Sequence, residues 1–477
     1  MKKFLGVSTL ALCCALFSGK ASAISLNEAV SIAVQTSPEV GQAVENREAV
    51  EFELRQARGL YLPSVDLEAF GGGRRLASPT RTSVGFLGTG LSPAQASLVV
   101  TQSLYQSGAR RAEIERQASR VDGASFRVLE RSSSIGLQVV EQYLEYLLQL
   151  QIRKGALANL SFHRRISGDI ESAISGGTLT EADRQQVKER LFAAEARLKE
   201  AEEAASAASI NFFRLVGQPL KSAQRPTPAR KVIPASLTGA IALGKQKNSR
   251  IRAAKADVDA SDADVRAARA QRGPQILAEA RSRIGFDVDG SDGRTSDIEG
   301  RLVARWNLYR GGIDRANEQE QVRRASEQRL VLAQAYREVE AAVRISWDRR
   351  NRQVDLARTL RQQARENASL VNSYERQFGV GRRSLLDVLD AQNTRFNSDV
   401  LSTSANFAAL FSEYQLLAAT GQLLHSLGVE HPVQAEAYGR IEFRVRETQD
   451  ADVYYREDSR QINELPLDLL APFRKKN

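Results

Sequence analysis

The chain has 477 residues, of which 42% are hydrophobic and 26% charged, and its formal net charge is +10. Basic and acidic residues are interleaved throughout, which is typical of a solvated helical surface. The three histidines, His163, His425 and His431, lack metal-ligand spacing, and no serine, cysteine or histidine forms a recognisable nucleophile–base pair. The sequence therefore predicts no enzyme, no metal site and no cofactor.

The first 23 residues have the pattern of a secretory signal peptide. Lys2 and Lys3 precede an apolar run, and a small-residue cleavage site ends at Ala23. Both cysteines lie inside this segment, and Leu12 stands where a lipid-anchored protein would need a small residue. We expect a mature chain with no disulfide and, once three lysines are removed with the signal, a charge of +7. Such an exported chain is not expected to bind nucleic acid, although its basic charge alone would allow it.

The mature sequence is predicted to be a tandem duplication. Three pairs of residues recur 211 positions apart: Leu26 and Leu237, Val40 and Ile251, and Pro63 and Pro274. Repetition over this length indicates one architecture built twice. We predict a first repeat at residues 24–236, a second at 237–427, and a C-terminal tail at 428–477. In the first repeat, Ser37 and Pro38 predict the start of a helix that ends near Gly59.

After the proline in each repeat the hydrophobic period changes to two, which predicts two β-strands. We expect them at about 64–75 and 95–104, and again at about 275–286 and 297–308. Each strand has one largely apolar and one largely charged face. Two hairpins cannot close a barrel in one chain, and an open edge in a membrane leaves backbone groups unpaired. The pattern favours an oligomeric barrel with a water-filled lumen over two hairpins packed on a soluble core.

Helical periodicity then resumes over a stretch far longer than a globular helix. It extends from Gly108 to Gly177 and from Gly312 to Gly381, 69 residues in each case. At 1.5 Å per residue this is roughly 100 Å. In the helix that follows each turn, apolar residues recur in alternating steps of four and three, which is typical of a coiled coil. In each repeat, the return helix and the helix that precedes the strands have a combined length close to that of the one long helix.

The two turns between the long helices and the return helices, at about 174–183 and 378–390, hold the candidate functional residues. These are the turn glycines Gly177 and Gly381 and the aspartates Asp183, Asp387 and Asp390. The two second-repeat aspartates lie three residues apart at a helix start, so they share a face where negative charge is favourable. Glycine predicts the turn itself, because it adopts backbone conformations that other residues avoid.

The run from Phe378 to Gln392, FGVGRRSLLDVLDAQ, resembles the tip sequence of the TolC family of outer-membrane channel proteins. The Leu-Tyr-x-x-Gly strand exits and the Gly-Gln pairs at 217–218 and 421–422 are similar to the family pattern, and the resemblance covers residues 26–424. It implies a mostly α-helical homotrimer. Each chain would give four strands to a twelve-stranded β-barrel in contact with outer-membrane lipid, and a long helical barrel would extend into the periplasm of a Gram-negative bacterium.

The resemblance also implies roles for the tip residues. These are a periplasmic gate of Asp183, Phe378 and Arg383, and a cation-selective acidic ring of Asp387 and Asp390. Two positions depart from the family, because Phe378 replaces a tyrosine and Ala182 replaces a threonine. Both changes remove a polar contact, so the gate is expected to depend mainly on Arg383 or to open more readily.

The implied function is the exit duct of a tripartite export system. Its partners would be a periplasmic adaptor protein and an inner-membrane ABC or RND transporter. We predict type I protein secretion, and the alternative is the outer-membrane component of a multidrug efflux pump. Two other classes stay open. A periplasmic adaptor or structural coiled-coil protein would share the heptads but lack the strand pairs, and a periplasmic binding module would need an α/β pattern that is missing.

Overall fold

The computed structural model describes residues 24–75, 90–176, 180–220, 223–228, 232–288, 293–451 and 453–455. The chain divides into two compact units. The tip unit comprises Met1–Ala33, Gln138–Pro228 and Arg352–Phe411, and the sheet unit comprises Val34–Leu137, Ala229–Asn351 and Ser412–Asn477. Within the described ranges, every helix lacks the continuous apolar stretch that crossing a membrane would require.

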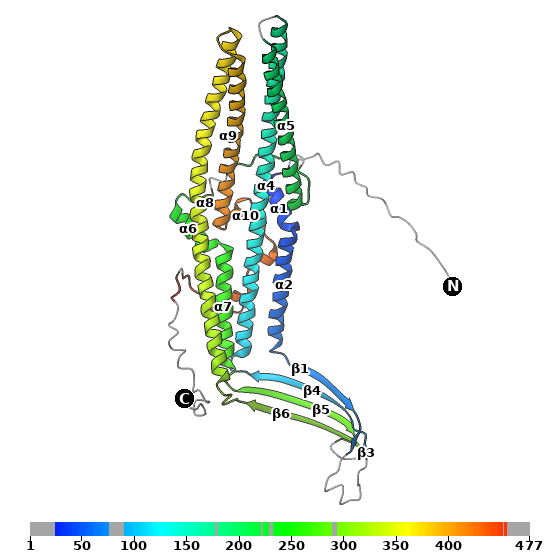
Figure 1. Cartoon of the computed structure of the whole chain (residues 1–477). Coiled ribbons are helices and arrows are strands. Elements are labelled where there is room, and N and C mark those ends of the chain that lie inside the picture. The colour runs from blue at the N-terminus through cyan, green and yellow to red at the C-terminus, as the bar shows by residue number, and fades with distance from the viewer. Residues whose placement is uncertain are drawn as a thin grey trace, which may run out of the picture. The chain divides into compact units, whose positions relative to one another are not determined.

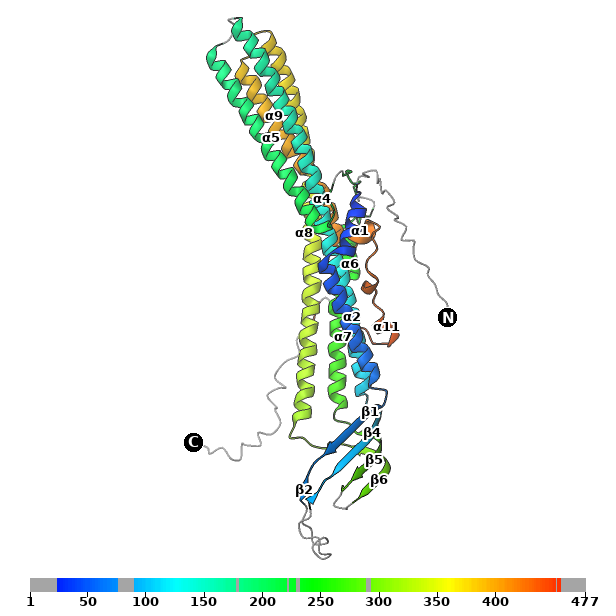
Figure 2. The ribbon, with the colours of Figure 1, turned by 90° about the vertical axis from the view of Figure 1, so that its right-hand side faces the viewer.

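Two helical hairpins form most of the tip unit, and Figures 1 and 2 show their turns at the same end. One hairpin joins the end of α4 (Ala109–Ser175) to α5 (Glu181–Val216). The other joins the end of α8 (Ile313–Gly379) to α9 (Leu385–Ala419). The long helices α4 and α8 have 67 residues each, which confirms the length predicted from the spacing of the glycines.

The two hairpins pack against each other through two apolar clusters. The cluster nearer the turns is formed by Ile166, Ile170, Val187, Leu385 and Leu389. The second cluster is formed by Ala156, Leu160, Ala194, Leu198, Ala201 and Phe396. The apolar seam predicted for α5 is therefore buried, and it ends at Val216, four residues after the buried Phe212.

The sheet unit combines parts of α4 and α8 with shorter helices. Its complete helices are α2 (Pro38–Gly59), α6 (Leu237–Lys247), α7 (Ser249–Ala270), α10 (Leu423–Ser426), η1 (Val433–Ala435) and α11 (Gly439–Glu442). The helix α1 (Leu26–Thr36) contributes to both units. Ser37 is the N-cap residue of α2, as predicted, but its side chain makes no capping hydrogen bond. Pro38 fits the first helical position because no intrahelical partner exists there for an N–H group.

An antiparallel sheet of four strands lies in the sheet unit, in the order β1-β4-β5-β6 (Figure 1). Its strands are β1 (Ser64–Gly71), β4 (Ala94–Tyr105), β5 (Gln275–Phe286) and β6 (Arg294–Arg305). A separate short pair joins β2 (Arg74–Arg75) and β3 (Gly90–Leu91). The strand β1 stops at Gly71 rather than continuing to residue 75, because two further glycines follow and weaken strand pairing.

The strand predicted at 297–308 lies three residues earlier than expected. Arg305, the last residue of β6, is paired with Gln275, the first residue of β5. Pro274 precedes Gln275 and has no N–H to extend the ladder. The partner strand, rather than the hydrophobic pattern of β6 itself, therefore sets where β6 ends.

The two faces of the sheet differ in polarity, as the alternating pattern predicts. On one face β5 and β6 place opposite charges directly across from each other: Glu279 and Arg301, Arg281 and Glu299, and Arg283 and Asp297. Arg301 Nη2 lies 2.7 Å from Glu279 Oε2, and Arg283 pairs with Asp297. The other face exposes large apolar side chains, which include Val65, Leu67, Leu98, Ile284, Ile298 and Leu302.

Candidate functional site

The turn between α8 and α9 is built around Gly381. This glycine has a φ of 71°, and its N–H donates to the Phe378 carbonyl oxygen at 2.9 Å. The helix α9 then starts after Ser384, whose Oγ accepts from the Asp387 N–H at 3.2 Å and donates to Asp387 Oδ2 at 2.8 Å. Asp387 therefore forms a reciprocal capping contact that fixes the start of α9.

Asp183 makes the corresponding contact at the start of α5. Thr180 is the N-cap residue, its N–H donates to Asp183 Oδ2 at 2.8 Å, and its Oγ1 accepts from the Asp183 N–H at 3.4 Å. Hydrogen bonds from Thr180 lower the pKa of Asp183 below its ordinary value of 3.8, and those from Ser384 do the same for the pKa of Asp387. Both carboxylates are thus charged at neutral pH. Gly177, the turn glycine predicted here, lies outside the described residues.

Arg383 contacts its own turn within the described chain, and no ion pair there joins it to Asp183. Its Nε donates to Gln377 Oε1 at 3.1 Å, and its guanidinium lies 4.2 Å from the centre of the Tyr374 ring. Its Nη1 lies 3.6 Å from Asp387 Oδ2. The pairing of Arg383 with Asp183 expected for a gate would therefore have to form between two copies of the chain, and it stays a prediction.

Asp390 faces an arginine of the other hairpin. Its Oδ1 accepts from Arg190 Nη2, on α5, at 3.0 Å. Each aspartate of the predicted acidic ring thus has an arginine within 4 Å, Arg190 for Asp390 and Arg383 for Asp387. Phe378 is partly buried against the apolar cluster nearer the turns, so an aromatic ring without a hydroxyl fits this position by packing.

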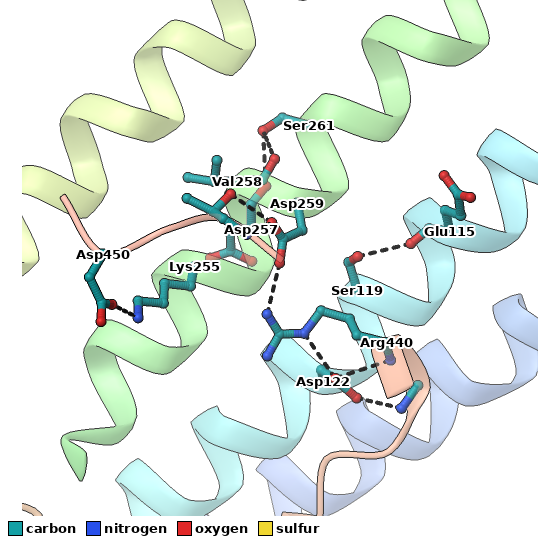
Figure 3. Close-up of polar contacts among 12 residues, drawn as sticks. Glu115, Ser119, Asp122, Lys255, Asp257, Val258, Asp259, Ser261, Arg440 and Asp450 are labelled. Atoms are coloured by element: carbon teal, nitrogen blue, oxygen red, sulfur yellow. Dashed lines mark hydrogen bonds and ion pairs between the residues drawn. The ribbon is translucent and has the colours of Figure 1, made fainter. Parts of the chain in front are cut away.

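A buried charge network in the sheet unit was not found from the sequence (Figure 3). Arg440 of α11 donates from Nε to Asp122 Oδ2 at 3.0 Å and from Nη1 to Asp259 Oδ2 at 2.8 Å. The three side chains come from α11, α4 and α7. They lie 318 and 181 residues apart in sequence, so no local spacing signals the network.

The backbone of the C-terminal segment is held by the same two aspartates. Asp122 Oδ1 accepts from the Gly439 N–H at 2.7 Å, and Asp259 Oδ1 accepts from the Thr448 N–H at 2.7 Å. A Cβ atom at position 439 would come within 2.5 Å of the Ala118 carbonyl oxygen, so glycine allows α11 to lie against α4. The segment that includes α11 is therefore part of the sheet unit's core rather than a loose tail.

Residues 241–422 match the family model described as outer membrane efflux protein, and no curated protein sequence matches the chain. The structure is similar to the outer membrane channel CmeC of Campylobacter jejuni, with 15% identity, a TM-score of 0.73, and 83% of this chain and 86% of that chain covered. It is also similar to the outer membrane protein VceC of Vibrio cholerae, with 18% identity and a TM-score of 0.69 over 85% and 97% of the two chains. A third similar structure is the MtrE channel of Neisseria gonorrhoeae, solved in an open state. It has 18% identity and a TM-score of 0.69, and the match covers 84% of this chain and 89% of that chain.

The chain has the TolC-like outer-membrane channel fold. Residues 241–422 are similar to the outer membrane efflux protein domain, and the likeness of the whole chain to the solved channels is one of fold. This domain contains both strands of the second hairpin, β5 and β6, and the whole of α8 and α9. Its range lies inside the second repeat predicted at 237–427, whereas the first repeat is matched through the TolC-like fold alone.

Proposed function

We propose that the chain is the exit duct of a tripartite export system, connected by a periplasmic adaptor to an inner-membrane transporter. The match of residues 241–422 to outer membrane efflux proteins carries this proposal. The sheet supports it, since β1 and β6 leave two open edges and the faces differ in polarity. Three copies would close twelve strands into a barrel, with apolar faces toward lipid and charged faces toward water.

Two cargo classes are supported by different observations. The tip sequence from Phe378 to Gln392 resembles that of the TolC family and favours type I protein secretion through an ABC transporter. The description of the matched domain favours a second candidate, the efflux of small toxic compounds by an RND transporter. We retain type I secretion as the proposed cargo class, and the phenotype of a deletion strain separates the two.

The deletion strain is compared with the same strain complemented by the intact gene. Loss of particular proteins from the medium, with unchanged sensitivity to dyes and detergents, is the result expected for type I secretion. Greater sensitivity with an unchanged set of secreted proteins would assign the chain to efflux. Purified protein that produces no conductance in planar bilayers would contradict a channel of either kind.

We further propose that Asp183, Phe378 and Arg383 form the gate and that Asp387 and Asp390 form the acidic ring. Arg383 lies beside Asp387, so this one arginine belongs to the proposed gate and also neutralises part of the proposed acidic ring. Arg383→Ala should therefore increase single-channel conductance and, by leaving Asp387 without its arginine, also increase cation selectivity. Both quantities are measured in planar bilayers.

Two comparisons make this test specific. Asp387→Ala combined with Asp390→Ala should weaken cation selectivity and block by multivalent cations. If Arg383 pairs with Asp183 across copies, Asp183→Ala should also raise conductance, and the double variant with Arg383→Ala should add little to either change. Additive effects would contradict the pairing, and unchanged selectivity would place the ring elsewhere.

A further inference from the structure

A buried histidine lies in the core of the tip unit. His163 of α4 is 3% exposed, and its Nδ1 has no hydrogen-bond partner. Its ring stands edge-on to the ring of Phe162, with centroids 5.5 Å apart and an angle of 87° between the planes. Burial of a charged group without a partner is far less favourable than burial of a neutral one. This environment therefore favours the neutral imidazole.

The histidine lies in a polar layer between the two apolar clusters of the tip unit. The layer is formed by Asn159, His163, Arg190, Asp390 and Gln392. Asn159 Oδ1 accepts from Gln392 Nε2 at 2.9 Å, and this hydrogen bond joins α4 to α9. The ion pair between Arg190 and Asp390 joins α5 to α9. At this level, polar contacts therefore join α9 to both helices of the other hairpin.

The charges near the imidazole come from the facing helices. On α5, Arg190 carries a positive charge and Glu189 a negative one, and α9 contributes Asp390 through its contact with Arg190. Burial lowers the pKa of His163 below its ordinary value of 6.5, the Arg190 charge lowers it further, and Glu189 opposes both effects.

The charged residues next to His163 on α4 form ion pairs with other helices. Arg164 lies 3.8 Å from Glu195 of α5, and Arg165 lies 2.8 Å from Glu375 of α8. The side chains of both arginines are well exposed. Glu189 of α5 and Asp390 of α9 are both paired with Arg190, so neither carboxylate is free for a protonated His163.

We propose that the polar layer makes the tip unit acid-sensitive, so that a proton on His163 separates the two hairpins at this level. The imidazolium would be a second cation beside Arg190 and would weaken the hold of Arg190 on Asp390. The packed state binds fewer protons than the separated state, so it is most stable above about pH 6.5 and loses stability as the pH falls below that value. This inference concerns packing within the tip unit and does not depend on the proposed channel function.

Hydrogen exchange of the purified full-length chain tests the inference. Peptides from α4, α5 and α9 are compared at pH 7.5 and pH 5.0, after correction for the intrinsic pH dependence of exchange. We expect protection in the polar layer to fall by about tenfold or more in the intact chain, because acid favours the separated state, which binds more protons. His163→Gln cannot gain the proton, so its protection should change by less than about twofold.

Two further variants test the electrostatic origin of the response. Arg190→Gln removes a charge that disfavours the imidazolium in the packed state, so the acid loss of protection should be smaller than in the intact chain. Glu189→Gln removes a charge that favours the imidazolium there, so its acid loss should be larger. The inference is overturned if His163→Gln shows the acid loss of the intact chain, or if the intact chain shows none. Should His163→Gln fail to fold, acid losses that change in the same direction in the other two variants would overturn it.

Discussion

Arg440 is 7% exposed, and the two carboxylates that it holds, Asp122 and Asp259, are 2% and 1% exposed. Removing one partner of such a buried pair leaves uncompensated charge and costs about 3–5 kcal/mol. Arg440→Ala should therefore lower the free energy of unfolding by about that amount. The loss is measured from urea-induced unfolding of the detergent-solubilised protein, followed by circular dichroism.

A second arginine contact to α11 supplies the control. Arg58 Nη2 lies 2.6 Å from Glu442 Oε1, and the two side chains are 45% and 47% exposed. Exposed ion pairs contribute only about 0–1 kcal/mol, so Arg58→Ala should change stability little. If both variants lose the same stability, the burial of Arg440 is not what makes its contacts important.

At the residue scale, the position of Asp387 could be predicted, but the partners of the acidic residues could not. Asp387 was expected near a helix start, and the structure adds its capping contact with Ser384, three positions away. Asp390 was also expected at a helix start, but its partner Arg190 lies 200 residues away. Arg440 gave no signal at all, because charged residues are common in this sequence and only the tertiary structure selects its two partners.

The hydrophobic period predicted where the helices and strands lie. It did not predict where a strand ends, because that is set by the neighbouring strand. The two long helices and β5 lie where the period predicts them. The end of β6 was misplaced by three residues because Pro274 ends the partner strand. A period reports which face of an element is buried, but it contains no information about where a neighbouring strand stops supplying backbone hydrogen bonds.

Matched glycines end the two return helices and give an element-scale prediction. Gly217 follows α5 with φ of 74°, and Gly421 follows α9 with φ of 73°. A side chain in this left-handed conformation costs roughly 1–2 kcal/mol. A Cβ at Gly421 would also lie 2.7 Å from the Lys247 carbonyl oxygen, whereas nothing lies within 4 Å at Gly217.

Gly217→Ala should therefore lower the free energy of unfolding by roughly 1–2 kcal/mol, and Gly421→Ala should lower it further. The additional loss arises because the backbone around Lys247 must move to admit the methyl group. Thermal unfolding of both variants beside the parent chain gives the comparison. Equal losses would mean that this backbone shifts at no cost and that the close approach at Gly421 does not constrain the sequence.

At the scale of the whole molecule, the two open edges of the sheet are complementary in charge. Asp66 and Glu68 of β1 lie opposite the uncharged Val99 and Ser97. On the same face of β6, Arg305 lies opposite the uncharged Gln275. When copies join edge to edge, the acids of one β1 would meet the β6 edge that carries Arg305 in the next copy, and cross-strand pairs of opposite charge contribute about 0.2–1 kcal/mol each.

Charge reversal at these edges tests how the copies join. Asp66→Lys combined with Glu68→Lys should reduce the fraction of trimer on unheated gels, because like charges then meet at every junction. Adding Arg305→Glu should restore part of that fraction, although Arg305→Glu alone should lower it. A trimer fraction that is unaffected by all three variants would contradict this edge pairing while leaving the channel function open.

The predicted repeat does not show which segments of the chain form each compact unit. Each compact unit takes segments from both predicted repeats, 24–236 and 237–427. A duplication shows which segments correspond to each other, but it does not show which of them pack together. The pairing of β4 with β5, which joins strands from the two repeats, is one example that only the structure reveals.

The position of Arg440 near the end of the chain has a consequence for biosynthesis. Asp122 and Asp259 are synthesised long before residue 440. Until Arg440 is present, these two carboxylates lack the cation that pairs with them, and their burial is unfavourable. The core of the sheet unit can therefore close only after residue 440 has emerged. Products that terminate before α11 would retain an open, unstable core and would be recognised by proteases.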